Sequence, residues 1–420
     1  MGATRRIREG LAAAACTLIG AGAAHARTVD VDTALLFYSE FDRVSLAEGV
    51  VNLSKVLDEH RTLSGRVVFD ALTGASANGA LPSDRAQTFT SPSGESSYTV
   101  QPGDTPLDKS FRDTRIAFSG NLQQQLDRLT LLTTGAEFST ELDYQSIGIN
   151  ALLARDFFKR NTTLSAGLSL AHDTNRPQGG IPVAFARMAP AGFAQPRNGE
   201  SDGKNLFDVL AGVTQVLSPS MLVQVNYSRG HVSGYQTDPY KVVSVAESTP
   251  GPDLGRPVQT LYERRPDRRT KQSVYGKLKR SVGEGAVDLS YRYLWDDWGI
   301  RSQTVELLVH APLGPNRFLE PSVRYYHQKK ADFYRRSLLS GAALPDFASA
   351  DYRLGTFDAV TAALQFGGSL ERDRSFNVRL GYYLQMGDNS PPEAIGVQRG
   401  LDLFPNVGAL FGELTYGFGK

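Results

Sequence analysis

The chain has 420 residues, a formal net charge of +1 and a single cysteine. Such balanced charge gives no basic stripe for nucleic acid, so nucleic-acid binding is excluded. One cysteine can form neither an internal disulfide nor a thiolate metal cluster. Beyond the N-terminal region, no segment approaches 18 consecutive apolar residues, which excludes membrane-spanning helices but leaves membrane-spanning strands open.

The N-terminal region has the three parts of a secretory signal peptide. Three arginines form a basic start, Leu11–Gly22 is a short apolar stretch, and an Ala-His-Ala sequence ends at Ala26. A membrane anchor is the alternative, but the apolar run is too short for one. We therefore predict cleavage after Ala26 and a single domain over 27–420. Removing residues 1–26 removes three arginines, one glutamate and Cys16, so the charge falls from +1 to −1 and no cysteine remains.

The segment Val287–Val309 predicts the repeating unit of the fold. From Val287 to Trp295 apolar and aromatic residues occupy the odd positions and mostly polar residues the even ones, and the alternation returns after Asp297-Trp298-Gly299. A period of two indicates strands, and about ten residues cross a hydrocarbon core at a tilt. A soluble sandwich is the alternative. An apolar side tipped with aromatics that recurs along the chain favours a transmembrane β-barrel, with the polar side lining a lumen.

Segments of this kind recur along the chain after residue 33. About sixteen are expected, with a range of fourteen to eighteen, and single-chain bacterial barrels have an even number of strands. The predicted strands are 33–41, 48–57, 62–72, 111–121, 127–137, 143–155, 161–172, 205–217, 220–231, 271–281, 286–297, 302–311, 318–329, 353–369, 375–387 and 407–418.

Every second connector is predicted to be tight. Short turns on one rim and long loops on the other are typical of outer-membrane barrels, with the turns in the periplasm and the loops outside the cell. An even strand count then places both ends of the barrel in the periplasm. The predicted turns are Asp58–Arg61, Leu122–Leu126, Asp156–Arg160, Ser218-Pro219, Val282–Gly285, Pro312–Arg317 and Glu371–Arg374. The long loops are 73–110, 173–204, 232–270, 330–352 and 388–406.

The last predicted strand places Leu414, Tyr416 and Phe418 at alternate positions. This partly resembles the C-terminal signal that the barrel-assembly machinery recognises in outer-membrane barrels. That signal usually finishes on the aromatic residue, whereas Gly419 and Lys420 follow here. The barrel-assembly machinery is therefore an expected partner during biogenesis, together with outer-membrane lipid and lipopolysaccharide.

Several phrases of the chain, in order and correctly spaced, resemble a family of Gram-negative outer-membrane β-barrel proteins that is known only as a domain of unknown function. The resemblance spans nearly all of the mature chain. It implies a barrel in the bacterial outer membrane and no particular activity, so no catalytic, cofactor-binding or metal-binding residue is carried across. The phrases lie at Asp70–Ala80, Gln87–Gly94, Glu141–Ser146, Gly234–Lys241, Glu263–Thr270, Ser290–Ile300, Arg324–Tyr334 and Ser349–Leu354.

Charged residues at predicted inward positions are candidates for a constriction in the lumen. Arginines facing carboxylates across neighbouring strands make charge-assisted hydrogen bonds and can set the field through which a solute passes. The alternative is that paired charges simply fill part of the interior. The candidates are Arg292, Arg324, Arg379, Asp288, Asp296, Glu306 and Glu320.

A run of arginines in a predicted long loop could bind lipopolysaccharide phosphates through bidentate contacts at the outer rim. The alternative is that these arginines are ordinary solvated charges where the loop meets the barrel. The candidates are Arg264, Arg265, Arg268 and Arg269. Acidic residues also cluster in the long loops, but no spacing matches a calcium-binding loop, so we expect no metal site.

The function expected from these patterns is a passive, porin-like channel for small hydrophilic solutes, with the 73–110 loop folding inward over the bore. One alternative is a non-conducting barrel that scaffolds a periplasmic or surface partner, possibly a redox system; the channel could also be a homo-oligomer. A third is a lipid-modifying enzyme that uses His172 with Asp173. No nucleophile elbow accompanies that pair, so we expect neither enzyme activity nor a cofactor.

Overall fold

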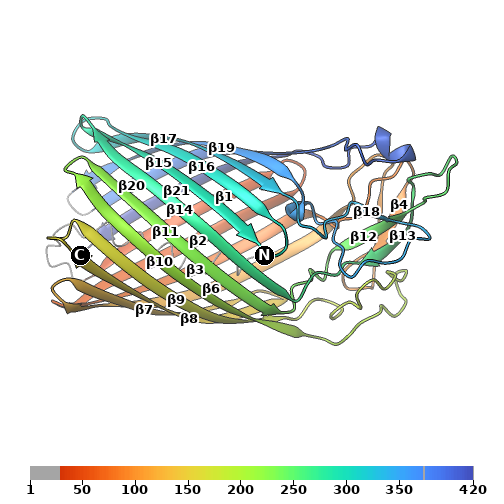
Figure 1. Cartoon of the computed structure of the whole chain (residues 1–420), viewed down its shortest axis with the longest axis horizontal. Helices are drawn as coiled ribbons and strands as arrows, with labels where there is room; N and C mark the ends of the chain where they lie inside the picture. Colours follow the sequence, from red (N-terminus) through yellow and green to blue (C-terminus); the bar gives the residue numbers. More distant parts are fainter. Residues whose placement is uncertain (1–28, 372–373, 420) are drawn as a thin grey trace.

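The computed structural model describes residues 29–371 and 374–419, and the predicted signal peptide lies outside the described residues. Sixteen antiparallel strands form one closed barrel, in which the first strand, β1 (Asp30–Glu40), pairs with the last, β21 (Val407–Gly419) (Figure 1). Closure leaves the wall without an unpaired edge. No helix in the described ranges is long and apolar enough to cross a membrane.

The barrel strands follow chain order around the wall, so each pairs with its neighbours in sequence. The prediction of sixteen strands is confirmed, with most boundaries shifted by a few residues. Between β1 and β21 lie β2 (Val44–Asp58), β3 (Arg61–Ala77), β6 (Leu107–Asp127), β7 (Thr130–Thr140), β8 (Tyr144–Phe157), β9 (Thr162–Asn175), β10 (Asp202–Ser218), β11 (Met221–Gly234), β14 (Arg268–Val282), β15 (Gly285–Asp296), β16 (Arg301–Pro312), β17 (Arg317–Lys329), β19 (Phe357–Glu371) and β20 (Arg374–Gly387).

The alternation of side chains explains why the strands close on themselves. On β15, Leu289 and Tyr291 point outward and are each 45% exposed. Ser290 and Arg292, which alternate with them along the strand, point inward and are half-buried. The same outward apolar row occurs on the other strands. In water this surface would be a large exposed apolar patch, which soluble monomers avoid. Contact with the hydrocarbon core of a membrane removes the cost of exposing this apolar surface to water.

The two ends of the barrel differ as predicted. At one end, the turn end, described connections such as those after β2 and β10 have two residues each, and those after β8 and β16 have four. At the other, the loop end, five connections are long: 78–106, 176–201, 235–267, 330–356 and 388–406. The predicted alternation of short turns and long loops is confirmed.

Two predicted boundaries are wrong. The predicted turn at Leu122–Leu126 is part of β6, which continues to Asp127. The pairing of β6 with β7 continues through this segment, so the turn comes only after Asp127. The strand predicted from 353 begins at Phe357 instead, because Tyr352–Leu354 forms a short 3-10 helix. The side chain of Asp351 caps this helix by accepting a hydrogen bond from the Arg353 amide.

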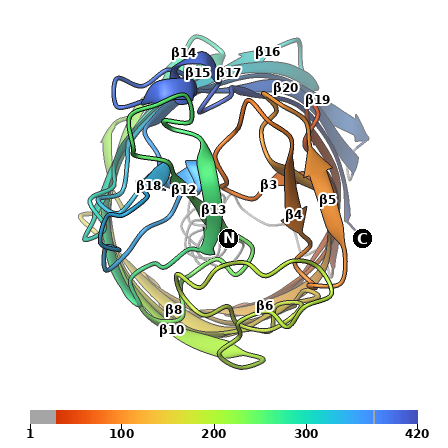
Figure 2. The same ribbon diagram turned by 90° about the vertical axis from the view of Figure 1, so that its right-hand side faces the viewer.

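The five long loops fold together at the loop end, and we call them the cap. Seen along the barrel axis, cap strands lie inside the outline of the wall (Figure 2). Two small sheets order the cap: the hairpin of β4 (Gln87–Thr90) with β5 (Ser97–Val100), and a three-stranded sheet in which β12 (Val242–Ala246) lies between β13 (Pro257–Tyr262) and β18 (Ser337–Leu339). Every residue of β12 is buried, so the cap has its own apolar core. The 73–110 loop therefore folds over the mouth together with the other loops.

A charge placed on the outward face tests the membrane-facing surface. Leu289→Arg should destabilise the folded barrel by about 2–4 kcal/mol if the residue lies near the bilayer midplane, because arginine is costly in hydrocarbon. Ser290→Arg is the matched control, since its side chain points into the lumen. Urea titration of both variants in liposomes measures the difference. Equal losses of stability would contradict the assigned orientation.

Candidate functional site

The three predicted lumen arginines line one side of the interior. Arg292 on β15, Arg324 on β17 and Arg379 on β20 all occupy inward positions. Arg324 lies opposite Glu306 in the register of β16 with β17, and Arg292 lies within electrostatic range of both residues. The structure therefore brings together four of the predicted lumen residues on one side of the wall.

Aromatic rings hold two of these guanidinium groups against the wall. The guanidinium carbon of Arg292 lies 5.4 Å from the centre of the Tyr275 ring, and that of Arg379 lies 5.8 Å from the Phe411 ring. Cation–π contacts of this length fix a side chain without neutralising its charge. The positive charge stays available to the lumen.

The predicted acids nearer the turn end have basic partners. Asp288 lies 2.7 Å from the ammonium of Lys277 and 3.6 Å from that of Lys279. Glu320 lies 3.0 Å from Nδ1 of His310. These carboxylates are inward-facing as predicted, but their local partners reduce their contribution to the field in the bore.

Asp296 is not a lumen residue, which corrects its assignment to the constriction. Its side chain is fully buried; it accepts a hydrogen bond from Nε of Arg269 at 2.8 Å and others from the amides of Trp298 and Ile300. It therefore organises the tight connection at the loop end of β15. The period of two placed it inward but could not show that Arg269 and the connection 297–300 enclose it.

Sequence reasoning missed a group of acids on the other side of the interior. Glu48, Asp70, Glu137 and Asp208 lie at inward positions of β2, β3, β7 and β10. Arg115 contacts Asp70 and lies 3.6 Å from Glu48. The alternation could have identified these positions, but only the strand order shows what faces them.

Strand order sets the two groups of charges against each other. In the closed order of sixteen strands β7 is the fifth and β17 the thirteenth, so they face each other across the barrel. Glu137 and Arg324 lie in the central parts of these strands. One side of the lumen therefore carries the arginines and the opposite side an excess of acids, which produces a transverse electric field.

The four arginines predicted to contact lipopolysaccharide divide into two pairs. Arg264 and Arg268 are exposed and remain candidates. Arg265 and Arg269 are not free for lipid, which corrects half of that assignment: Arg265 lies 2.6 Å from Glu263, and Arg269 pairs with Asp296 and stacks 4.3 Å from the Trp298 ring. Neighbouring arginines at the end of the loop and the start of β14 thus differ, with one of each pair exposed and the other paired with an acid.

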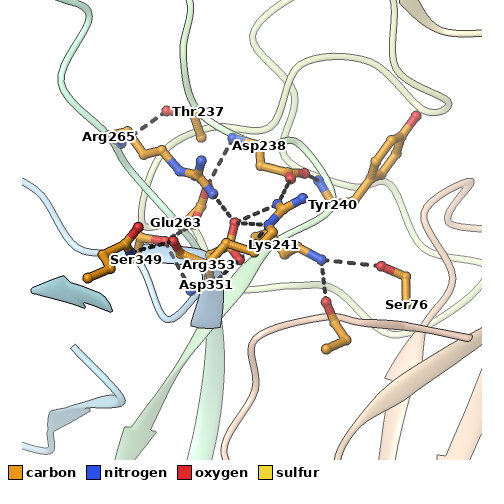
Figure 3. A network of polar contacts seen from close by, with 12 residues as sticks. Ser76, Thr237, Asp238, Tyr240, Lys241, Glu263, Arg265, Ser349, Asp351 and Arg353 are labelled. Carbon is orange, nitrogen blue, oxygen red and sulfur yellow. Dashed lines mark hydrogen bonds and ion pairs between the residues drawn. The ribbon is translucent and has the colours of Figure 1, made fainter. Parts of the chain in front are cut away.

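A buried ionic network joins two loops of the cap to the end of β3 (Figure 3). Arg265 binds Asp351 at 2.9 Å and Arg353 binds Asp238 at 2.7 Å, while Arg353 also chelates Asp351. The ammonium of Lys241 reaches the backbone carbonyl of Ala77 and lies 3.4 Å from the Ser76 hydroxyl. With Glu263 the network contains three acids and three bases, so its charges balance.

Basic partners keep Asp351 and Asp238 ionised, whereas burial raises the pKa of Glu263. Burial opposes the charge of Asp351, but Arg353 and Arg265 outweigh it and hold the pKa of Asp351 well below its ordinary value. Burial also opposes ionisation of Asp238, and Lys241 and Arg353 together lower its pKa to about 2. The network therefore holds the cap together throughout the neutral range.

Three carboxylates at the loop end are the described residues best placed to hold a metal ion. Oxygens of Asp113, Glu141 and Asp143 lie within 4.8 Å of one another. The Tyr240 hydroxyl donates a hydrogen bond to Asp143 at 2.5 Å, and burial raises the pKa of Asp143. The three carboxylates repel one another, and either a proton or a cation would relieve that repulsion.

The structure does not support the alternative in which His172 acts with Asp173. Adjacent strand residues point to opposite faces. His172 is exposed on the outside and its Nδ1 lies 2.8 Å from Asn205, whereas Asp173 is buried inside and accepts a hydrogen bond from the Tyr144 hydroxyl. The geometry thus separates the two groups on which the lipid-modifying alternative depended.

The comparison with protein families agrees with this architecture. The family model of the proteins of unknown function called DUF3570 matches residues 8–418, so the chain belongs to this family. No curated protein matches the sequence.

Solved structures similar to this one are barrels from bacterial outer membranes. The siderophore receptor PirA from Acinetobacter baumannii is 9% identical, with a TM-score of 0.43, and the match covers 87% of this chain and 54% of the receptor chain. The chain thus spans about half the length of such receptors. A bacterial polysaccharide outer membrane secretin is 8% identical, with a TM-score of 0.47, and the match covers 94% of this chain and 100% of the secretin. The CymD monoaromatic hydrocarbon channel is 8% identical, with a TM-score of 0.40, and the match covers 94% of this chain and 89% of the channel.

Removing one member of the buried network should loosen the cap. Arg353→Met leaves Asp351 and Asp238 without their closest cation, and breaking a buried ion pair costs about 3–5 kcal/mol. Hydrogen exchange of 235–267 and 330–356 should accelerate while the strands stay protected. Arg268→Met, at an exposed position, is the control. Unchanged exchange in Arg353→Met would show that the network does not hold the cap.

The cap should also loosen in acid. Because the pKa values of Asp351 and Asp238 are depressed in the folded cap, their stabilisation is complete above the ordinary value of 3.8 and is lost as the pH falls toward 2. Hydrogen exchange of the cap, corrected for its intrinsic pH dependence, should therefore show no loss of protection from pH 7 to about 4 and decreasing protection below. The raised pKa of Glu263 causes no loss of protection as the pH falls, because protonation of this buried carboxyl removes an unfavourable charge. A loss of protection centred near pH 6 would contradict this assignment.

Proposed function

We propose that this protein is a porin-like passive channel for small hydrophilic solutes in the bacterial outer membrane. The turn end faces the periplasm and the cap faces the outside. The closed wall, its apolar outward band and its charged interior support the proposal.

One observation carries the proposal: inward-facing charged side chains remain exposed to solvent. Arg66 on β3 and Arg324 on β17 point into the closed barrel, yet both are exposed. Isolated charges in a dry interior would cost several kcal/mol each, so a sealed barrel would pair or replace them. Water inside the wall is the physical condition for passing a hydrophilic solute.

The transverse field gives the bore a preference among solutes. The side of the bore that carries Arg292, Arg324 and Arg379 faces an acidic side that includes Glu137. A dipolar solute can align between the two sides, whereas an ion of either sign is attracted by one side and repelled by the other. The bore therefore discriminates weakly by net charge.

Reversal potentials in planar bilayers test the lumen assignment. Arg324→Glu should shift the channel toward cation selectivity, because it replaces a positive lumen charge by a negative one. Arg268→Glu makes the same charge change at an exposed position at the start of β14, at the loop end, and should have a smaller effect. If the two variants shift the potential equally, Arg324 does not line the conducting path.

Shortening the cap tests whether the channel conducts. The Asn78 amide donates to the Pro106 carbonyl at 3.1 Å, so a short Gly-Asn turn can replace 79–105 without breaking β3 or β6. This variant should conduct more than the full-length protein, because part of the cover over the mouth is gone. If both proteins insert into the bilayer and neither conducts, the channel proposal fails.

A scaffold for a surface or periplasmic partner is the second candidate function. Apolar side chains exposed on the cap favour it: Phe193 is 69% exposed and Leu344 54%. Purification in mild detergent discriminates the two, since a stable complex supports the scaffold and lone copies or homo-oligomers support the channel. Contact of Arg264 and Arg268 with lipopolysaccharide is compatible with both.

A further inference from the structure

A partly enclosed cavity lies between the cap and the rim of the wall, and none of the lumen residues described above lines it. Its volume is about 50 Å³. Four loop-end segments line it: the connector 41–43, and the loops 78–106, 330–356 and 388–406. The lining contains two arginines, three aromatic residues and no carboxylate.

The first of these arginines has no carboxylate partner in the described part of the chain. The guanidinium of Arg43 lies 5.5 Å from the centre of the Tyr352 ring, which orients it without neutralising it. Arg43 is half-buried, so the group is partly desolvated but still reachable. Tyr352 itself packs edge-on against Phe404 at 6.2 Å, so the ring that holds the guanidinium is fixed.

The second arginine is already neutralised. Arg336 lies 2.8 Å from Glu393, and its Nη2 donates to the backbone carbonyl of Asp388 at 3.0 Å. Its Nε is buried without a hydrogen-bond partner among the described residues. Arg336 therefore adds a hydrogen-bond donor to the cavity wall and no net charge, and the single excess positive charge belongs to Arg43.

The cavity size limits what can enter. A water needs about 10–15 Å³ of such space, and a cavity that binds a benzene ring has about 150 Å³. The volume observed here takes a few waters or one small group, and not a ring. A single unpaired guanidinium matches a monoanion, and its planar fork matches the two oxygens of a carboxylate.

We propose that this cavity is a binding site for the carboxylate group of a small extracellular solute. Arg43 binds the two carboxylate oxygens, and Arg336 contributes a further donor. The buried phenyl ring of Phe404 and the side chain of Leu81 exclude water around the ion pair. No lumen residue described above lines the site, so the proposal does not require the bore to conduct.

Saturation-transfer NMR of acetate with the full-length protein in detergent tests the site. Acetate should bind saturably, and acetamide, its neutral isostere, should bind much more weakly. Arg43→Gln should weaken acetate binding about tenfold or more, because it removes the charge-assisted hydrogen bonds. Arg43→Lys should keep part of the affinity, since it keeps the charge.

The control variant is Arg85→Gln, which removes an arginine of the same loop end whose side chain is 66% exposed and does not line the cavity. It should bind acetate as the unaltered protein does. Unchanged far-ultraviolet circular dichroism and cap hydrogen exchange in Arg43→Gln separate lost binding from a disordered cap. Absence of saturable acetate binding, equal binding by Arg43→Gln, or binding of inorganic phosphate in preference to acetate would each overturn the proposal.

Discussion

The structure depends on one constraint: backbone N–H and C=O groups inside a bilayer must find partners within the protein. Sixteen strands meet this constraint only because β1 pairs with β21, which leaves no unpaired edge in the wall. The constraint also forces every side chain of the wall to one of two faces. The outward face must then be apolar, and the inward face is free to carry charge.

That freedom explains the interior. Arg324 and Glu137 lie on opposite strands of the closed order, and no apolar requirement acts on either. The cap is governed by a different rule, because its loops lie beyond the wall and must bury their own apolar residues. The buried strand β12 and the charge-balanced network around Asp351 and Arg353 show that it does so as a small folded unit.

Much of the wall could be predicted from the sequence, because a period of two is local information. On β15, for example, the alternation of apolar Leu289 and Tyr291 with polar Ser290 and Arg292 already specifies the outward and the inward face. What could not be predicted depends on contacts between distant segments. Asp296 follows the inward pattern but is covered by Arg269, and Arg265 and Arg269 belong to a charged run whose members point in different directions.

The cap shows the same limit. The residues Val242–Ala246 are apolar except for Ser244, which indicates a buried strand, but nothing local shows that β13 and β18 flank it. Nor does the spacing of Arg43, Arg336 and Phe404 indicate that they share one cavity. Such sites arise from how loops meet, and only their three-dimensional arrangement reveals them.

The central claim is that alternate residues of each strand separate hydrocarbon from water. Because the chain beyond Cys16 contains no cysteine, single cysteines can be introduced along β15 and treated, in liposomes, with a charged thiol reagent that does not cross lipid. The account predicts modification at positions 290 and 292 and protection at 289 and 291. Modification of neighbouring positions at equal rates, or protection of all four, would contradict it.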